Sequence, residues 1–144
     1  MPIIIPLTIM PQAGHDLRKP LSRRLRRWHS QLIKQGLYFT ELPVTEHHKL
    51  RKRAKRLRYG LQFAESLLSP KLLRPYRKRL AQIQDLLGEF NDLALAHDIY
   101  QQHVTAYPQA WFALGWISAR QQHLSEQTQD AFERLNKTPG FWKP

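Results

Sequence analysis

The chain has 144 residues, of which 23 are Lys or Arg and 11 are Asp or Glu, so its formal net charge is +12 with histidine neutral. Its length suits one domain, and its 42% hydrophobic and 24% charged residues are ordinary for a folded protein, which argues against disorder. It has no cysteine, which excludes disulfides, thiolate catalysis and cysteine-ligated zinc. No stretch approaches the ~20 apolar residues of a membrane span, and the start lacks the features of a signal peptide, so we expect a cytoplasmic protein.

The positive charge is concentrated in the first half of the chain. Residues 18–79 contain 19 of the 23 Lys and Arg but only three acidic residues, whereas residues 80–144 contain four basic and seven acidic ones. This asymmetry indicates a polyanionic partner, such as nucleic acid, polyphosphate or an anionic membrane surface.

The N-terminal part is predicted to contain an arm and the first helix. Residues 1–14 include three prolines and are predicted to form an extended arm before a single domain over residues 15–144. The first helix is predicted to begin after Asp16, which can act as its N-cap, and to end at Gln35, where Gly36 can terminate it.

Two further helices are predicted on either side of a break at residues 69–70. The second is predicted to be capped by Thr45 and to end near Leu68. The third is predicted from Pro75 to Val104, after a turn at residues 70–74, because Pro75 interrupts the pattern that precedes it.

The fourth helix is predicted from Gln109 to Asn136, and the aromatic pair Phe141–Trp142 is predicted to fold back onto the helices. Its residues predicted to be available for burial are Trp111, Leu114, Ile117, Leu124 and Phe132. Because short connections favour antiparallel neighbours, the fold class is predicted to be all-α, an antiparallel four-helix bundle.

The second helix carries the most informative motif, HHKLRKRAKRLRY at residues 47–59, which has no acidic residue. Its apolar residues recur at helical spacing, so one face is predicted to pack on a core while a dense cationic face points outward. Along that outward face runs a ladder at three- and four-residue steps, formed by His48, Arg51, Lys55, Arg58 and Gln62. Like charges at this spacing destabilise a helix by roughly 0.2–0.5 kcal/mol per pair, which an anionic ligand would relieve.

The charged residues of the second and third helices do not by themselves require a polyphosphate site. The basic face could be only a solvated surface, or it could bind nucleic acid, although it has almost no Asn or Gln to read base edges and only Tyr59 to stack on bases. Asp85 and Asp92 lie seven residues apart, on one helix face, and could form a catalytic pair for phosphate esters. We instead expect them to brace arginines of the second helix, Arg58 above all, and we expect no metal site and no cofactor. Mid-helix Gly88 is predicted to allow close approach of a neighbouring helix.

Two motifs of the chain resemble a known family. The pattern H-x-L-R-x-x-x-K-R-L-R-Y at residues 48–59, followed by I-Q-D-L-L-G-x-x-x-D at residues 83–92, resembles the CHAD family of histidine-bearing α-helical domains that bind inorganic polyphosphate. Gly115, Arg120 and the closing aromatic pair extend the resemblance over about residues 15 to 142. It implies a non-catalytic module with a basic groove, and the chain lacks the E-x-E-x-K motif of the triphosphatase domains often fused to such modules.

The resemblance and the charge pattern together predict the binding residues. They are His48, Arg51, Lys52, Lys55, Arg56, Arg58 and Tyr59 of the second helix, Arg74, Arg77 and Lys78 of the third, and Arg18, Arg23 and Arg27 of the first. The usual family domain is about twice as long as this chain, which resembles its C-terminal half alone. We therefore expect a homodimer, or a partner chain, whose second copy supplies the opposite wall of the groove.

Overall fold

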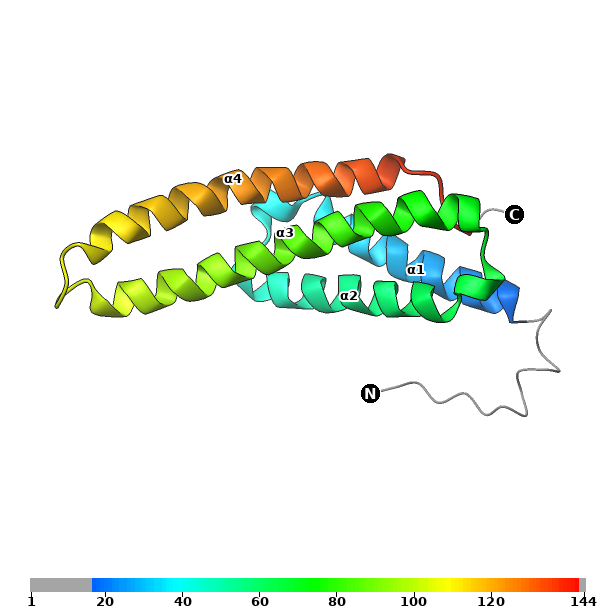
Figure 1. The fold of residues 1–144 in the computed structure, drawn as a ribbon, viewed down its shortest axis with the longest axis horizontal. Coiled ribbons are helices and arrows are strands. Elements are labelled where there is room, and N and C mark those ends of the chain that lie inside the picture. Colours follow the sequence, from blue (N-terminus) through cyan, green and yellow to red (C-terminus); the bar gives the residue numbers. More distant parts are fainter. Residues whose placement is uncertain (1–16, 143–144) are drawn as a thin grey trace, which may run out of the picture.

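The computed structural model describes residues 17–142, and it contains helices and no strand within that range. The helices are α1 (Arg18–Gly36), α2 (Val44–Phe63), α3 (Pro70–His103) and α4 (Ala110–Lys137), with short 3₁₀ turns η1 (Phe39–Glu41) and η2 (Glu65–Leu67). Four helices packed against one another confirm the predicted all-α fold (Figure 1). The predicted arm at residues 1–14 and the predicted cap Asp16 lie outside the described residues. Among the described residues, no helix is both long and apolar enough to cross a membrane.

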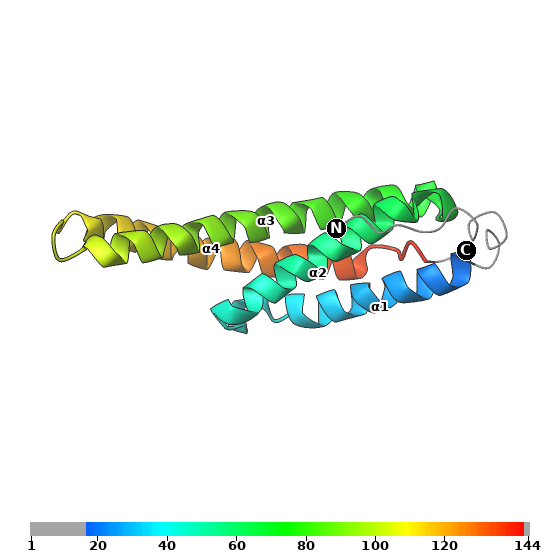
Figure 2. The ribbon, with the colours of Figure 1, turned by 90° about the horizontal axis from the view of Figure 1, so that it is seen from below.

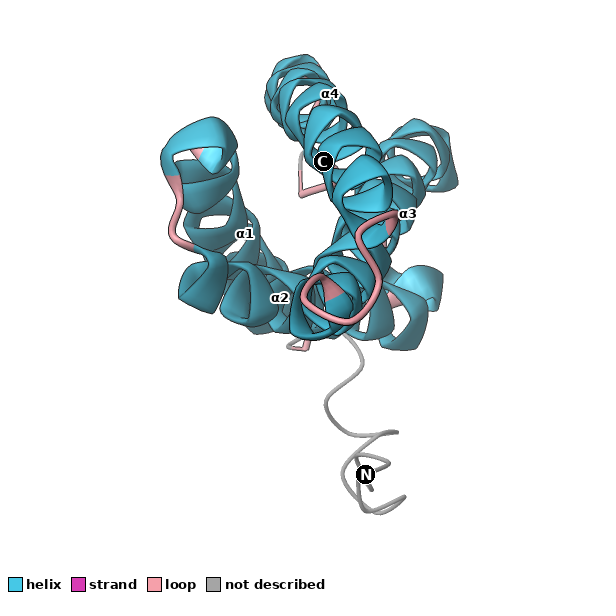
Figure 3. Cartoon of the chain, turned by 90° about the vertical axis from the view of Figure 1, so that its left-hand side faces the viewer, coloured by secondary structure: helices cyan, strands magenta, loops and turns pink. Residues whose placement is uncertain are grey.

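Helix α2 lies between α1 and α3, and α4 pairs with α3 along most of its length (Figures 2 and 3). The two C-terminal helices are much longer than the others: α3 has 34 residues and α4 has 28, against 19 for α1 and 20 for α2. Consequently the α3–α4 hairpin extends well beyond α1 and α2 at one end of the molecule (Figure 1).

The core confirms the predicted apolar face of the second helix. Leu50, Ala54, Leu57 and Leu61 of α2 are all fully buried. They meet the buried stripe of α3, which consists of Leu73, Tyr76, Leu80, Ile83 and Leu87. Because burying one leucine side chain contributes roughly 1.5–3 kcal/mol, this stripe fixes the rotation of α2 and leaves its cationic face outward.

Several helix ends differ from the prediction. Helix α3 begins at Pro70, and Pro75 lies inside it, where its missing N–H leaves only the carbonyl of exposed Lys71 without a helical partner. Helix α2 ends at Phe63 and η2 follows, so the predicted continuous helix to Leu68 is wrong. The predicted cap Thr45 lies within α2, whose first turn is instead preceded by Pro43.

For two glycines the structure differs from the prediction. Gly36 is the last residue of α1, but its backbone is not left-handed; a β-carbon there would overlap the Phe132 ring, so the glycine allows α1 to approach α4. Gly88 has no heavy atom within 4 Å of where its β-carbon would be, so the predicted close approach of a neighbouring helix is wrong.

The end of the chain closes the core as predicted. Phe141 is buried and meets the Tyr76 ring edge-on at 4.7 Å, and the Trp142 ring lies 4.9 Å from that of His29. On α4, four of the five predicted burial positions are buried. The exception is Trp111, which is 65% exposed because it lies on a different side of α4 from the buried Leu114 and Ile117, in the part of α4 that extends beyond α1 and α2.

Candidate functional site

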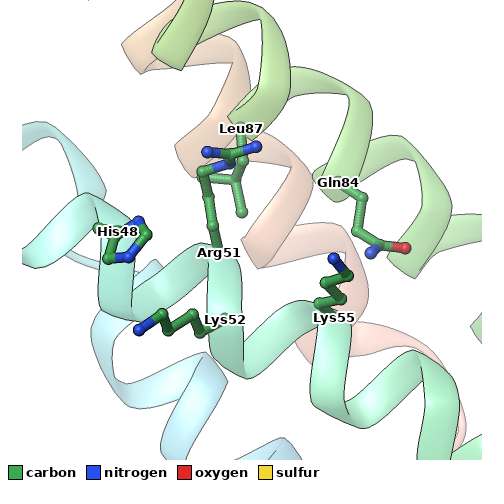
Figure 4. Close-up of a pocket in the computed structure, with 6 residues that line it drawn as sticks. All are labelled: His48, Arg51, Lys52, Lys55, Gln84 and Leu87. Atoms are coloured by element: carbon green, nitrogen blue, oxygen red, sulfur yellow. The ribbon is translucent and has the colours of Figure 1, made fainter. Parts of the chain in front are cut away.

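A groove runs along the outer seam between α2 and α3. Its first part is a hollow of about 260 Å³ lined by His48, Arg51, Lys52 and Lys55 of α2 and by Gln84 and Leu87 of α3. In Figure 4, Arg51 extends toward Leu87 and Lys55 toward Gln84, whereas Lys52 points away from α3. Three of the four α2 side chains therefore follow the predicted ladder, and α3 forms the facing wall.

The groove continues toward the other end of α2. A second hollow, of about 410 Å³, is lined by Arg58 and Leu61 of α2 and by Arg77, Lys78, Leu80, Ala81, Gln84 and Asp85 of α3. A third, of about 270 Å³, is lined by Glu65, Pro70, Leu73, Arg74 and Arg77. Gln84 borders the first two hollows and Arg77 the last two, so the three hollows are neighbours along α3, and we call them together the α2–α3 groove.

Most cations of the groove are not neutralised by the protein. Within the described residues, no carboxylate lies within 4.0 Å of the charged nitrogens of Arg51, Lys55 or Arg58. Arg77 is paired, since its Nη1 lies 3.1 Å from an Oε1 of Glu65. The row Arg51, Lys55 and Arg58 spans seven residues, or ~10 Å of helix, and offers its charges to whatever enters the groove.

The predicted bracing by aspartates is wrong. Asp85 borders the same hollow as Arg58 but makes no ion pair with it, and Asp92 is exposed and pairs with no residue of α2. The ion pair that α3 does make from this stretch joins Glu89 to Arg120 of α4, at 2.8 Å.

An aromatic contact fixes the start of α2. The His47 ring stacks on Phe39 at 4.6 Å and meets the edge of Phe90 at 4.8 Å. Neither ring nitrogen of His47 has a hydrogen-bond partner among the described residues. Burial lowers the pKa of His47, and the nearby backbone of Leu42 raises it by a smaller amount. Because successive helical residues point about 100° apart, the half-buried His47 turns exposed His48 to the mouth of the groove.

A protein-family model matches most of the chain. The chain matches the family model described as CHAD domain over residues 6–101. The chain belongs to the CHAD domain family. The matched range includes both walls of the groove, whereas Gly115, Arg120 and the closing aromatic pair lie beyond it. No curated protein and no solved structure matches the chain.

Not all predicted binding residues of this CHAD domain line the groove. Arg56 turns toward α1, where its guanidinium lies 4.4 Å from the centre of the Trp28 ring and donates to Gln31 at 3.4 Å. Tyr59 is exposed but does not border the hollows. The same holds for the predicted residues of α1, which are Arg18, Arg23 and Arg27.

The α2–α3 groove also has features that the site prediction missed. Gln84 and Leu87 of α3 line it. Gln84 lies seven residues after Arg77 and therefore on the same helix face, so this spacing could have indicated that Gln84 borders the groove. The opposite wall was expected on another copy, but α3 of the same chain provides it. Within residues 17–142, no group of three or more His, Asp or Glu side chains could hold a metal ion.

Proposed function

We propose that this CHAD domain binds inorganic polyphosphate in the α2–α3 groove without catalysing a reaction. The observation that carries the proposal is the row of cations without carboxylate partners along a groove with two walls. The binding residues are His48, Arg51, Lys52, Lys55 and Arg58 on α2 and Arg74, Arg77 and Lys78 on α3.

The chemistry of these side chains suits a chain of phosphates. A guanidinium can donate two parallel hydrogen bonds to phosphate oxygens and remains charged at any relevant pH. The unpaired cations repel one another along α2, so a bound polyanion removes this repulsion as it forms its own contacts. The groove lacks aromatic groups on which bases could stack, and Gln84 is the one amide among the residues that line it, which favours polyphosphate over nucleic acid.

A long polyphosphate would extend beyond the groove. On leaving it across the exposed surface of α2, the chain would meet Arg56 and Tyr59 and then the arginines of α1, namely Arg18, Arg23 and Arg27. These residues are proposed as secondary contacts that increase the affinity for long chains over short ones.

We propose that the groove is not catalytic because its carboxylates are not paired with each other. Asp85 is the one carboxylate that borders the two hollows between α2 and α3, and it has no acidic neighbour in them. General acid–base catalysis on a phosphate ester would need a second acidic or basic group on the opposite side of the reacting phosphate from Asp85.

A competition experiment tests the proposed ligand. Labelled long-chain polyphosphate, bound to the full chain at ~150 mM salt, is displaced by unlabelled polyphosphate, duplex DNA or single-stranded DNA at equal phosphate concentrations. We expect polyphosphate to compete at least tenfold better per phosphate than either DNA, corresponding to about 1.4 kcal/mol. Equal competition per charge would show that the groove binds any polyanion, and better competition by DNA would overturn the proposal.

A further inference from the structure

The α3–α4 hairpin has an end that no other helix covers. On α3, the core that this helix shares with α1 and α2 extends as far as Phe90. On α4, the last contact with η1 is at Gln129, whose Oε1 accepts hydrogen bonds from the hydroxyl and the backbone N–H of Thr40 at 2.8 and 3.0 Å. Beyond these residues only the two helices and their connection remain (Figure 1). We call residues 91–128 the hairpin end.

The hairpin end exposes an unusual amount of apolar surface. Seven of the eleven exposed large hydrophobic residues in the described chain lie there: Leu95, Ile99, Tyr100, Tyr107, Trp111, Phe112 and Trp116. At roughly 150–250 Å² per large side chain, their exposed fractions amount to about 900 Å². These residues do not all share one face, but Trp111, Phe112 and Trp116 lie on one side of α4 and together expose roughly 500 Å². Monomeric proteins rarely expose an apolar patch of more than a few hundred Å², so this side of α4 indicates a partner.

On α4, large exposed rings lie beside a glycine. Trp111, Phe112 and Trp116 are 65%, 87% and 63% exposed, and they surround Gly115 on the side of α4 opposite its buried Leu114 and Ile117. A β-carbon at Gly115 would have no heavy atom within 4 Å, so the glycine leaves a notch between large rings. In an exposed helix this glycine costs about 1 kcal/mol relative to alanine, a cost that close approach of another helix would explain.

The charge of the hairpin end selects among possible partners. The hairpin end contains one basic residue, Arg120, and three acidic ones, Asp92, Asp98 and Glu126, so its formal charge is −2. Because the whole chain carries +12, the rest of the chain carries +14. Helices that lie on membrane surfaces are rich in Lys and Arg, and surfaces that stack on nucleic acid bases carry cations, so neither partner fits. Two copies that met through their grooves would bring strongly cationic surfaces together, whereas two hairpin ends carry only −2 each and repel far more weakly.

We propose that two copies of the chain form a two-fold dimer through their hairpin ends, with α4 crossing α4 of the second copy at Gly115. In such an interface each copy contributes the same patch, so the rings of one copy flank the glycine notch of the other. The roughly 500 Å² of exposed ring surface at this crossing corresponds to the apolar share, about 60%, of the ~800 Å² that each partner contributes to an interface of standard size. The two α2–α3 grooves stay open and lie away from the interface.

Mass measurement of the full chain tests the dimer. Light scattering on a sizing column at about 100 µM protein and high salt should give twice the 17.1 kDa of one chain. The double variant Phe112→Ser/Trp116→Ser should raise the dissociation constant at least about 30-fold, the effect of losing one strong interface aromatic. The control Tyr38→Ser/Val44→Ser, which replaces exposed residues elsewhere, should remain dimeric. Unchanged helical circular dichroism in each variant excludes loss of the fold as the cause.

Cross-linking tests the geometry independently. Because the chain has no cysteine, Gly115→Cys introduces a single thiol where a β-carbon fits, and oxidation should convert most of the protein into a covalent dimer. Lys71→Cys, near the start of α3 and far from the hairpin end, should give little dimer. The proposal would be overturned if the wild type were monomeric, or if its mass grew with concentration beyond two chains. Equal cross-linking of the two cysteine variants would also overturn it, as would a monomer that instead sediments with phosphatidylcholine vesicles.

Discussion

Replacing Arg51 and Lys55 together by glutamine is expected to weaken polyphosphate binding by about 100-fold at physiological salt. Both residues line the first hollow of the groove, and neither has a carboxylate partner among the described residues. A hydrogen bond to a charged group contributes roughly 1.5–3 kcal/mol, so losing two of them accounts for a change of this size. The slope of log affinity against log salt should also fall by about 1.5, because two fewer phosphate charges are neutralised.

The matched control for this variant is Arg134→Gln/Lys137→Gln. It removes the same two charges from the last turn of α4, outside the groove. Titration calorimetry over a range of salt concentrations should show less than about a threefold change in its affinity, since distant surface charges are largely screened. If both double variants lost affinity equally, net charge and not the groove would govern binding. The groove variant should remain fully folded, because it relieves like-charge repulsion on α2.

The second large effect is expected in the pH dependence of stability, and it originates at His29. This residue is buried beneath Trp142, and its Nδ1 shares a hydrogen bond of 2.6 Å with the Tyr76 hydroxyl. Burial, assisted by the positive charge of Arg26, lowers the pKa of His29 from 6.5 to about 4. Burial also raises the pKa of Tyr76, so its hydroxyl stays protonated and can donate to a neutral imidazole.

The depressed pKa gives this effect a definite sign. Above pH 6.5 the imidazole is neutral in both folded and unfolded chains, so it does not change stability with pH. As the pH falls below 6.5, the unfolded chain binds a proton that the folded chain excludes until about pH 4, so stability decreases through that window. Between about pH 7 and 4.5 the loss from this one residue should be about 2.5 kcal/mol.

Urea unfolding at the two pH values measures this loss. His29→Gln should lower stability at neutral pH but should lose about 2.5 kcal/mol less than the wild type on acidification. His123→Gln removes an exposed histidine of α4 and should keep the wild-type dependence. Identical losses in the wild type and His29→Gln would show that the imidazole is not held neutral by the fold.

Much of the fold could be predicted because apolar spacing records which helix face is buried. The positions on α2 from Leu50 to Leu61 follow one stripe, and they are buried as expected. Helix ends were less predictable, because Pro75 breaks a helix in principle but is tolerated near an exposed first turn. The exposure of Trp111 could not be foreseen either, since it depends on how far α1 and α2 extend along the long hairpin.

The candidate site was predictable on α2 and less so elsewhere. The phase of the basic residues against the apolar stripe places Arg51, Lys55 and Arg58 on one edge, and the structure brings these three to the groove. The sequence could not show that Arg56 would be drawn to the Trp28 ring of α1, because this depends on a contact between two helices. For the same reason it could not show that α3 of the same chain forms the facing wall.

The measurement that tests the central claim most directly is a map of polyphosphate contacts on the folded chain. Amide and arginine side-chain signals of the isotope-labelled protein are followed by NMR during titration with a short polyphosphate at ~150 mM salt. We expect the largest changes at residues 48–58 and 74–85, which form the two walls of the groove, and small changes at residues 110–137 of α4. Changes centred on the arginines of α1, or spread evenly over all basic residues, would contradict binding in the α2–α3 groove.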